Sequence, residues 1–242
     1  MSPCLQVQAL EVERGGAPAV HGVSADFTRG IWTGLVGANG SGKTSLLRAV
    51  AGRLAIAGGA ILLDGTDVSQ DRAARARSIG FAPDAAFLPD DLTPRQVFGL
   101  IDGSRGEGRD AALDDLSRAL TLDRFIDRKI GSLSAGTRQR IAIYSGFIGH
   151  AQGIVILDEP FNWLDPLTAY DTKQALQGLV AGGLTLITAL HDFGTLTTYC
   201  RRGLLLADGR LSLDLDAEAL TAGRADPEAF DHRVVEHLRP AP

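Results

Sequence analysis

Eight residues near the N-terminus place glycines, a lysine and a hydroxyl at a spacing suited to binding phosphate. Gly37 to Thr44 read Gly-Ala-Asn-Gly-Ser-Gly-Lys-Thr and fit the pattern G-x-x-x-x-G-K-[ST]. A strand is predicted at 31–36 and a helix at 45–51, as this pattern requires. The glycines let the backbone approach phosphates, and the N–H groups and helix dipole point at negative charge. The nucleotide contacts expected here are Gly37, Ala38, Asn39, Gly40, Ser41, Gly42, Lys43, Thr44 and Ser45, with Lys43 on the β- and γ-phosphates and Thr44 also on Mg²⁺.

Two carboxylates follow an apolar run, Ile154 to Leu157, that predicts a strand buried on both faces of a parallel sheet. The carboxyl ends of such strands are where open α/β sheets bind ligands. Asp158 is suited to the Mg²⁺ shell, and Glu159 to polarising a water against the γ-phosphate. The alternative is that both residues only cap the end of the strand.

A second possible anion site lies in Ser134-Ala135-Gly136-Thr137, before a helical run at 141–148. Small residues at a helix N-terminus can bind a phosphate. One nucleotide does not need two such sites from one subunit, whereas two subunits packed head to tail would each complete the other's site. The alternative is an ordinary helix N-cap.

Taken together, the chain resembles the nucleotide-binding subunits of ATP-binding-cassette (ABC) transporters from about residue 5 to 213. The loop at 37–44 matches the Walker A motif, 154–159 matches Walker B with its catalytic glutamate, and 133–137 matches the signature usually written LSGGQ. Residues 162–165 match the D-loop, which ends at Asp165. His191, after the apolar run at 184–190, matches the switch histidine. The resemblance implies that Glu159, His191 and Lys43 act in catalysis, and that Ser134, Ala135, Gly136, Thr137 and Asp165 contact nucleotide across a dimer.

Several residues depart from the family pattern. Ala135 replaces a glycine and Thr137 a glutamine, and the run Ser-x-Gly-x-Arg-Gln-Arg is similar to the exporter subgroup called ABC-2. Asp84 stands at the Q-loop glutamine position, where a carboxylate can still bind Mg²⁺; the alternative is a turn aspartate after a proline. Trp163 is bulky at a D-loop position that is usually small.

The sequence gives a weaker signal for residues that contact adenine than for residues that contact the phosphates. Arg14 lies about where an aromatic residue usually stacks on adenine, and a guanidinium plane can stack on a base too. The alternative is an exposed turn arginine beside Gly15 and Gly16. Trp32 lies in the strand before the phosphate loop, so we expect it to pack in the core. A lone histidine such as His191 is commonly structural, but its strand is predicted to lie beside that of Asp158, so it can reach a γ-phosphate.

Composition narrows the class of protein. The chain has 242 residues, 45% hydrophobic and 22% charged, which is ordinary for a globular protein. A net charge of −5 argues against broad nucleic-acid binding. Two cysteines are too few for a disulfide framework and favour a reducing cytosol. No signal sequence and no apolar run of about 20 residues is found.

The pattern of elements predicts one α/β domain, residues 1–242, with a single cassette and no internal repeat. The fold class is a mostly parallel P-loop sheet with helices on both faces, an N-terminal antiparallel β-subdomain and a helical subdomain. Antiparallel strands are expected at 5–12 and 23–27, and a further short strand at 60–63. Core strands are expected at 31–36, 79–82, 154–157, 184–188 and 203–206. A helical subdomain is expected at about 85–150, with helices at 94–101, 109–120 and 123–127 and a glycine-rich linker at Gly103, Gly106 and Gly108. The tail at 214–242 is predicted to be short and helical, with helices at 216–222 and 227–238.

The function implied by the resemblance is ATP binding and hydrolysis, with ATP and Mg²⁺, in an ABC transporter. The short tail mildly favours an exporter. Expected partners are a second copy in a head-to-tail dimer and a separate transmembrane permease, with no nucleic acid, and the expected location is the cytoplasmic face of the membrane. Alternatives are a soluble ABC ATPase acting on nucleic acid or ribosomes, and a regulatory module without turnover. The exported cargo stays open among haem or cytochrome maturation, drug and polysaccharide export.

Overall fold

A six-stranded sheet forms the centre of the protein. The computed structural model describes residues 3–103 and 111–238. The spatial order of the strands is β10 (Arg210–Leu215), β9 (Arg202–Ala207), β3 (Trp32–Gly37), β8 (Thr185–Leu190), β7 (Ile154–Asp158) and β6 (Ile79–Phe81). All neighbouring pairs are parallel except β10 with β9. Because β3, β7 and β8 are adjacent, the segments that follow their carboxyl ends meet at one edge of the sheet.

A smaller antiparallel sheet holds the N-terminal part of the chain. Its strands are ordered β2 (Ala17–Thr28), β1 (Pro3–Arg14), β4 (Gly58–Leu63) and β5 (Thr66–Asp67). Helix α1 (Lys43–Val50) packs against β1 and β2 on one side and against β3 and β7 on the other. The helix that begins at the phosphate loop is therefore held between the two sheets, which fixes its N-terminus.

Two hydrophobic clusters lie on opposite faces of the central sheet. In β7, Ile154 and Ile156 join the cluster shared with the antiparallel sheet, whereas Val155 and Leu157 join the cluster shared with the helices. This alternation follows from the two-residue period of a strand, and it confirms burial on both faces. Trp32 is 1% exposed and its indole N–H donates to the Thr188 hydroxyl at 2.8 Å, which confirms that it packs in the core.

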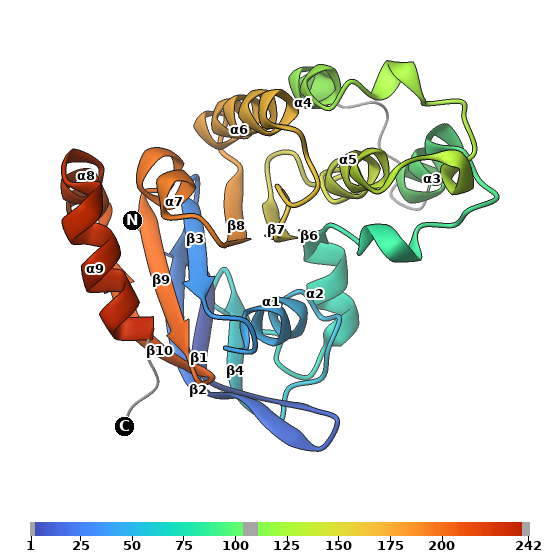
Figure 1. The fold of residues 1–242 in the computed structure, drawn as a ribbon. Coiled ribbons are helices and arrows are strands. Elements are labelled where there is room, and N and C mark those ends of the chain that lie inside the picture. The colour runs from blue at the N-terminus through green and yellow to red at the C-terminus, as the bar shows by residue number, and fades with distance from the viewer. Residues whose placement is uncertain (1–2, 104–110, 239–242) are drawn as a thin grey trace.

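The described residues between β6 and β7, 82–103 and 111–153, form helices and turns only and join neither sheet. They contain α3 (Pro94–Gly103), α4 (Asp114–Ala119), α5 (Ala135–Ser145) and short 3₁₀ turns at 85–87, 111–113, 122–124 and 130–132. Figure 1 shows α3, α4 and α5 gathered with α6 (Pro166–Ala181) at one end of the molecule, beyond β6, β7 and β8. Part of the predicted linker, Gly106 and Gly108, lies outside the described residues.

Three helix predictions in this region need correction. The helix expected at 123–127 is wrong, because only a 3₁₀ turn at Leu122–Arg124 forms after Thr121 adopts a left-handed φ of 51°. The helix expected at 141–148 begins at Ala135, since the Ser134 side chain caps it, and ends at Ser145. The helix expected at 109–120 is split in its described part, with a 3₁₀ turn at 111–113 before α4, and residues 109 and 110 lie outside the described residues.

The C-terminal part covers the far edge of the central sheet. Helices α8 (Ala217–Ala225) and α9 (Pro227–Leu238) pack on β9 and β10 (Figure 1). Phe230 and Val234 of α9 are buried. The tail helices expected from the sequence are therefore confirmed, whereas β10, α2 (Arg72–Ser78), α6 and α7 (Phe193–Tyr199) were not predicted. Across residues 3–103 and 111–238, no helix has the length and apolar character needed to cross a membrane.

A pair of glycines tests the packing of the helical region on the sheet. A Cβ at Gly80 in β6 would lie 2.2 Å from the Gly146 carbonyl oxygen, whereas one at Gly99 in α3 would meet nothing within 4 Å. We expect Gly80→Ala to lower the free energy of unfolding by about 1–3 kcal/mol, the usual cost of overpacking. Gly99→Ala should instead raise it by about 0.5–1 kcal/mol, because alanine favours a helix. Urea unfolding followed by circular dichroism measures both, and equal effects would contradict the packing described.

Candidate nucleotide site

The phosphate loop depends on glycines at two left-handed positions. Gly40 has a φ of 83° and Gly42 a φ of 100°, and a Cβ at Gly42 would lie 2.4 Å from the Ala19 carbonyl oxygen. The Lys43 ammonium donates to the carbonyl oxygens of Gly37 at 2.7 Å and Ala38 at 3.2 Å. Its side chain lies inside the curve of the loop, where an anion bound by the backbone N–H groups would meet it.

Lys43 is a buried cation beside two carboxylates. It is 4% exposed, and burial lowers its pKa, while the charges of Glu159 and Asp158 act in the opposite direction. Burying an ammonium is unfavourable unless an opposite charge lies near it. The carboxylates at the end of β7 therefore stabilise the charged form of Lys43 in the loop.

Asp158, the last residue of β7, carries a buried oxygen that is suited to a cation. Its Oδ1 has no hydrogen-bond partner among the described residues. Burial raises the pKa of Asp158, and the hydrogen bond from Thr44 opposes that shift. A carboxylate with an unpaired oxygen beside a hydroxyl matches the oxygen ligands that Mg²⁺ prefers. No group of three or more His, Cys, Asp or Glu side chains in the described residues could hold a metal by itself, so phosphate oxygens and water would complete the shell.

Glu159 follows directly and has an unusual backbone, with a φ of 51°. The His191 Nε2 lies 2.6 Å from its Oε1, and the Asn162 amide donates to its Oε2 at 2.9 Å. Strands β7 and β8 are paired with Asp158 opposite Ala189, and this register brings His191 to Glu159. The prediction that these two strands lie side by side in the sheet is confirmed.

Two adjoining hollows open at this edge of the sheet. The first, about 400 Å³, is lined by Arg48, Asp84, Asp158 and Trp163 among others. The second, about 310 Å³, follows the phosphate loop from Asn39 to Ser45. Both are also lined by Arg14, Thr44 and Glu159. The structure therefore brings Arg14, the loop, both carboxylates and Asp84 to one site, where the Asp84 Oδ1 also accepts a hydrogen bond from the Ala86 N–H at 2.9 Å.

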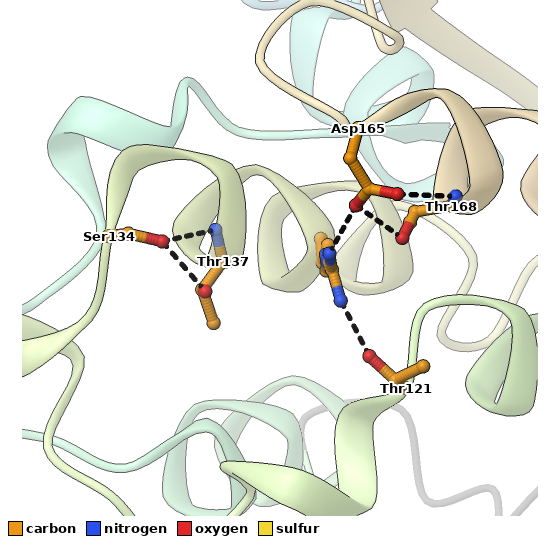
Figure 2. Close-up of polar contacts among 6 residues, drawn as sticks. Thr121, Ser134, Thr137, Asp165 and Thr168 are labelled. Atoms are coloured by element: carbon orange, nitrogen blue, oxygen red, sulfur yellow. Dashed lines mark hydrogen bonds and ion pairs between the residues drawn. The ribbon is translucent and has the colours of Figure 1, made fainter.

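The signature residues lie at the N-terminus of α5 and line neither hollow. The Ser134 hydroxyl accepts from the Thr137 N–H at 3.3 Å and lies 2.9 Å from the Thr137 hydroxyl (Figure 2). Ser134 is thus an N-cap, as the alternative interpretation proposed, and the cap leaves the first N–H groups of α5 unpaired within the helix. A Cβ at Gly136 would lie 2.5 Å from the Trp163 carbonyl oxygen, so only glycine fits against the D-loop here.

A residue that sequence reasoning missed joins the signature helix to the D-loop. Arg140 of α5 donates to the Asp165 carboxylate at 2.8 Å and to the Thr121 hydroxyl at 2.6 Å. Asp165 in turn caps α6 by accepting from the Thr168 N–H at 3.0 Å (Figure 2). Asp165 therefore faces its own chain here. The only sequence signal for Arg140 was its place in a helix that follows a capping serine. Its partners, Asp165 and Thr121, are set by tertiary structure and could not be read from that signal.

A comparison of the whole chain with known families decides its membership. The family model described as "ABC transporter" matches residues 20–162, more than half of the chain. The chain belongs to the ABC transporter family. The matched range contains the phosphate loop, the signature and both carboxylates, and the protein is accordingly an ATP-hydrolysing, nucleotide-binding member of that family.

Curated relatives of this ABC protein cover most of its length. It is 32% identical over 214 residues to the hemin import ATP-binding protein HmuV of Pseudomonas aeruginosa, covering 85% of this chain and 84% of that one. It is 31% identical over 244 residues to the cobalamin import ATP-binding protein BtuD of Halobacterium salinarum, covering 98% of this chain and 61% of that one. These names describe import, so the expected exporter direction and the ABC-2 subgroup find no support among them.

Solved structures confirm the fold. An ATP-binding subunit of an ABC transporter superposes with a TM-score of 0.84 at 24% identity, covering 98% of this chain and 100% of that one. A dimeric ATP-binding cassette in a post-hydrolysis state, bound to ADP and Pi, gives a TM-score of 0.77 at 21% identity, covering 88% of this chain and 98% of that one. The predicted ABC ATPase fold is correct.

The unpaired Asp158 oxygen predicts a stability change in the protein without nucleotide. Because burial of the ionised carboxylate is unfavourable, we expect Asp158→Asn to raise the melting temperature in the absence of Mg²⁺ and ATP. On adding MgATP the wild type should gain stability and the variant should gain less. Differential scanning calorimetry measures both, with Asp171→Asn on the exposed side of α6 as control. A lower melting temperature for Asp158→Asn without nucleotide would contradict this account.

Proposed function

We propose that this protein is the ATP-hydrolysing subunit of a membrane transporter and works as a dimer that closes over two MgATP molecules. The observation that carries the proposal is the convergence of Lys43, Thr44, Asp158 and Glu159 on adjoining hollows. The phosphate loop binds the triphosphate, Thr44 and Asp158 hold Mg²⁺, and Glu159 orients the attacking water. Such catalysis needs positioning and electrostatics more than covalent chemistry.

A second copy is needed because the signature lies away from the loop within one chain. Ser134 to Thr137 line neither hollow, yet the N-terminus of α5 offers N–H groups suited to an anion. In a head-to-tail dimer, the signature of one copy covers the γ-phosphate on the loop of the other. His191, which contacts Glu159, would stabilise the charge that develops during hydrolysis.

Asp84 is proposed as a further ligand of Mg²⁺ or of the attacking water. It shares the larger hollow with Asp158 and Glu159, and its Oδ2 is not used in the hydrogen bond to Ala86. Asp84 also begins the segment that leads from β6 into the helical region. A ligand at this position would connect the state of the nucleotide to the movement of that region.

The direction of transport that we propose is import. Relatives named for import of hemin, cobalamin and aliphatic sulfonates all align with more than four fifths of this chain. A separate transmembrane permease supplies the pathway, and this subunit binds it at the cytoplasmic face of the membrane. The relatives differ in cargo, which is consistent with cargo contacts that lie outside this subunit.

Glu159→Gln tests the proposed function. Removing a positioned carboxylate should lower ATP turnover by about 10²-fold or more while MgATP still binds. The variant should then accumulate as a dimer in MgATP, seen by size-exclusion chromatography with light scattering. Glu218→Gln, on the exposed side of α8, is the matched control and should behave as the wild type. Turnover by Glu159→Gln near the wild-type rate would refute the assigned role.

A further inference from the structure

The Glu159 carboxylate is held by two donors from two different segments. His191, which follows β8, contacts Oε1 at 2.6 Å, and Asn162, in the D-loop, donates to Oε2 at 2.9 Å. An ionised carboxylate has about four acceptor sites, so each oxygen keeps one site for water. The two contacts therefore fix the plane of the carboxylate without blocking it.

Asn162 reaches Glu159 because the backbone between them forms a turn. The Asn162 N–H donates to the Glu159 carbonyl oxygen at 3.3 Å, across Pro160 and Phe161. Glu159 adopts the left-handed φ of 51°, which is unfavourable for a residue with a side chain. The turn therefore brings the Asn162 side-chain amide back to Glu159. Its hydrogen bond to the carboxylate adds to the backbone hydrogen bond in holding the turn.

A single donor would not fix this carboxylate. The terminal torsion of a glutamate side chain is broad, so one hydrogen bond leaves the plane free to rotate. A second donor on the other oxygen removes that freedom, and a water must be held in a narrow range of distance and angle to attack in line.

Asn162 also connects this carboxylate to the signature. The next residue is Trp163, whose carbonyl oxygen leaves room only for glycine at Gly136. A shift of the signature helix against the D-loop must therefore displace the turn that carries Asn162.

From these contacts we propose that Asn162 is a positioning residue for ATP hydrolysis, which sets the orientation of the Glu159 carboxylate from the D-loop. The proposal rests on the proposed role of Glu159 as the water-orienting carboxylate. Asn162 also lines the larger hollow, and the role proposed here is that it acts through Glu159.

The test uses two variants that keep the shape of Asn162 and remove its donor. Asn162→Leu has no polar group, and Asn162→Asp replaces the amide nitrogen by an acceptor oxygen. We expect each to lower kcat by about tenfold, the effect of losing a hydrogen bond to a charged group. The KM for ATP of Asn162→Leu should stay within about twofold of wild type, and its MgATP-dependent dimer should still form.

Gln139→Leu is the comparison that separates positioning of the carboxylate from general support of the loop. The Gln139 amide donates to the Pro160 carbonyl oxygen at 3.2 Å, in the same turn but without touching Glu159. We expect a smaller fall in kcat for Gln139→Leu than for Asn162→Leu. A kcat of Asn162→Leu within twofold of wild type, or an equal loss in Gln139→Leu, would overturn the proposal. A wild type without ATPase activity would instead overturn the proposed function, and this inference with it.

Discussion

The burial of opposite charges beside the phosphate loop is the constraint on which the rest of the structure depends. Lys43 is almost fully buried, and burial shifts its pKa down while it shifts that of Asp158 up. Neither charge is well solvated. Glu159 and Asp158, with two backbone carbonyls, stabilise the Lys43 ammonium, and the Thr44 hydroxyl, with Arg48 and Lys43, opposes the cost of burying Asp158. A site arranged in this way stores unfavourable electrostatic energy that a triphosphate with its cation would relieve.

The fold provides this arrangement through adjacent parallel strands. The loop follows β3, the two carboxylates lie at the end of β7, and His191 follows β8 between them, so that three distant segments meet at one edge of the sheet (Figure 1). Helix α1 is fixed between the two sheets, which holds the loop at its N-terminus. The signature is held differently, since Arg140 and the glycine at 136 tie α5 to the D-loop. A movement of α5 would therefore reach the turn that carries Asn162 and Glu159.

Much of this site was predictable because its chemistry is local in sequence. The glycines at 40 and 42 mark left-handed positions, and the apolar run before Asp158 marks a buried strand. The contacts of Asn162 and Arg140 were not predictable, because they join segments whose approach is set by tertiary packing. The helix expected at 123–127 failed where Thr121 turns the chain. The exporter direction was inferred from a few signature residues and the short tail, whereas direction is a property of the whole transporter.

The most direct test of the composite site is cross-linking between two separately tagged chains, one carrying Asn39→Cys and the other Ser134→Cys. Both native cysteines, Cys4 and Cys200, are buried, and burial raises the pKa of the Cys200 thiol, so the introduced thiols should react first. Asn39 is exposed in the phosphate loop, and Ser134 caps the signature helix. The account predicts a disulfide-linked heterodimer that forms only when the chains are mixed and only with MgATP. No cross-link at saturating MgATP, or an equal yield without nucleotide, would contradict a nucleotide site shared between two copies.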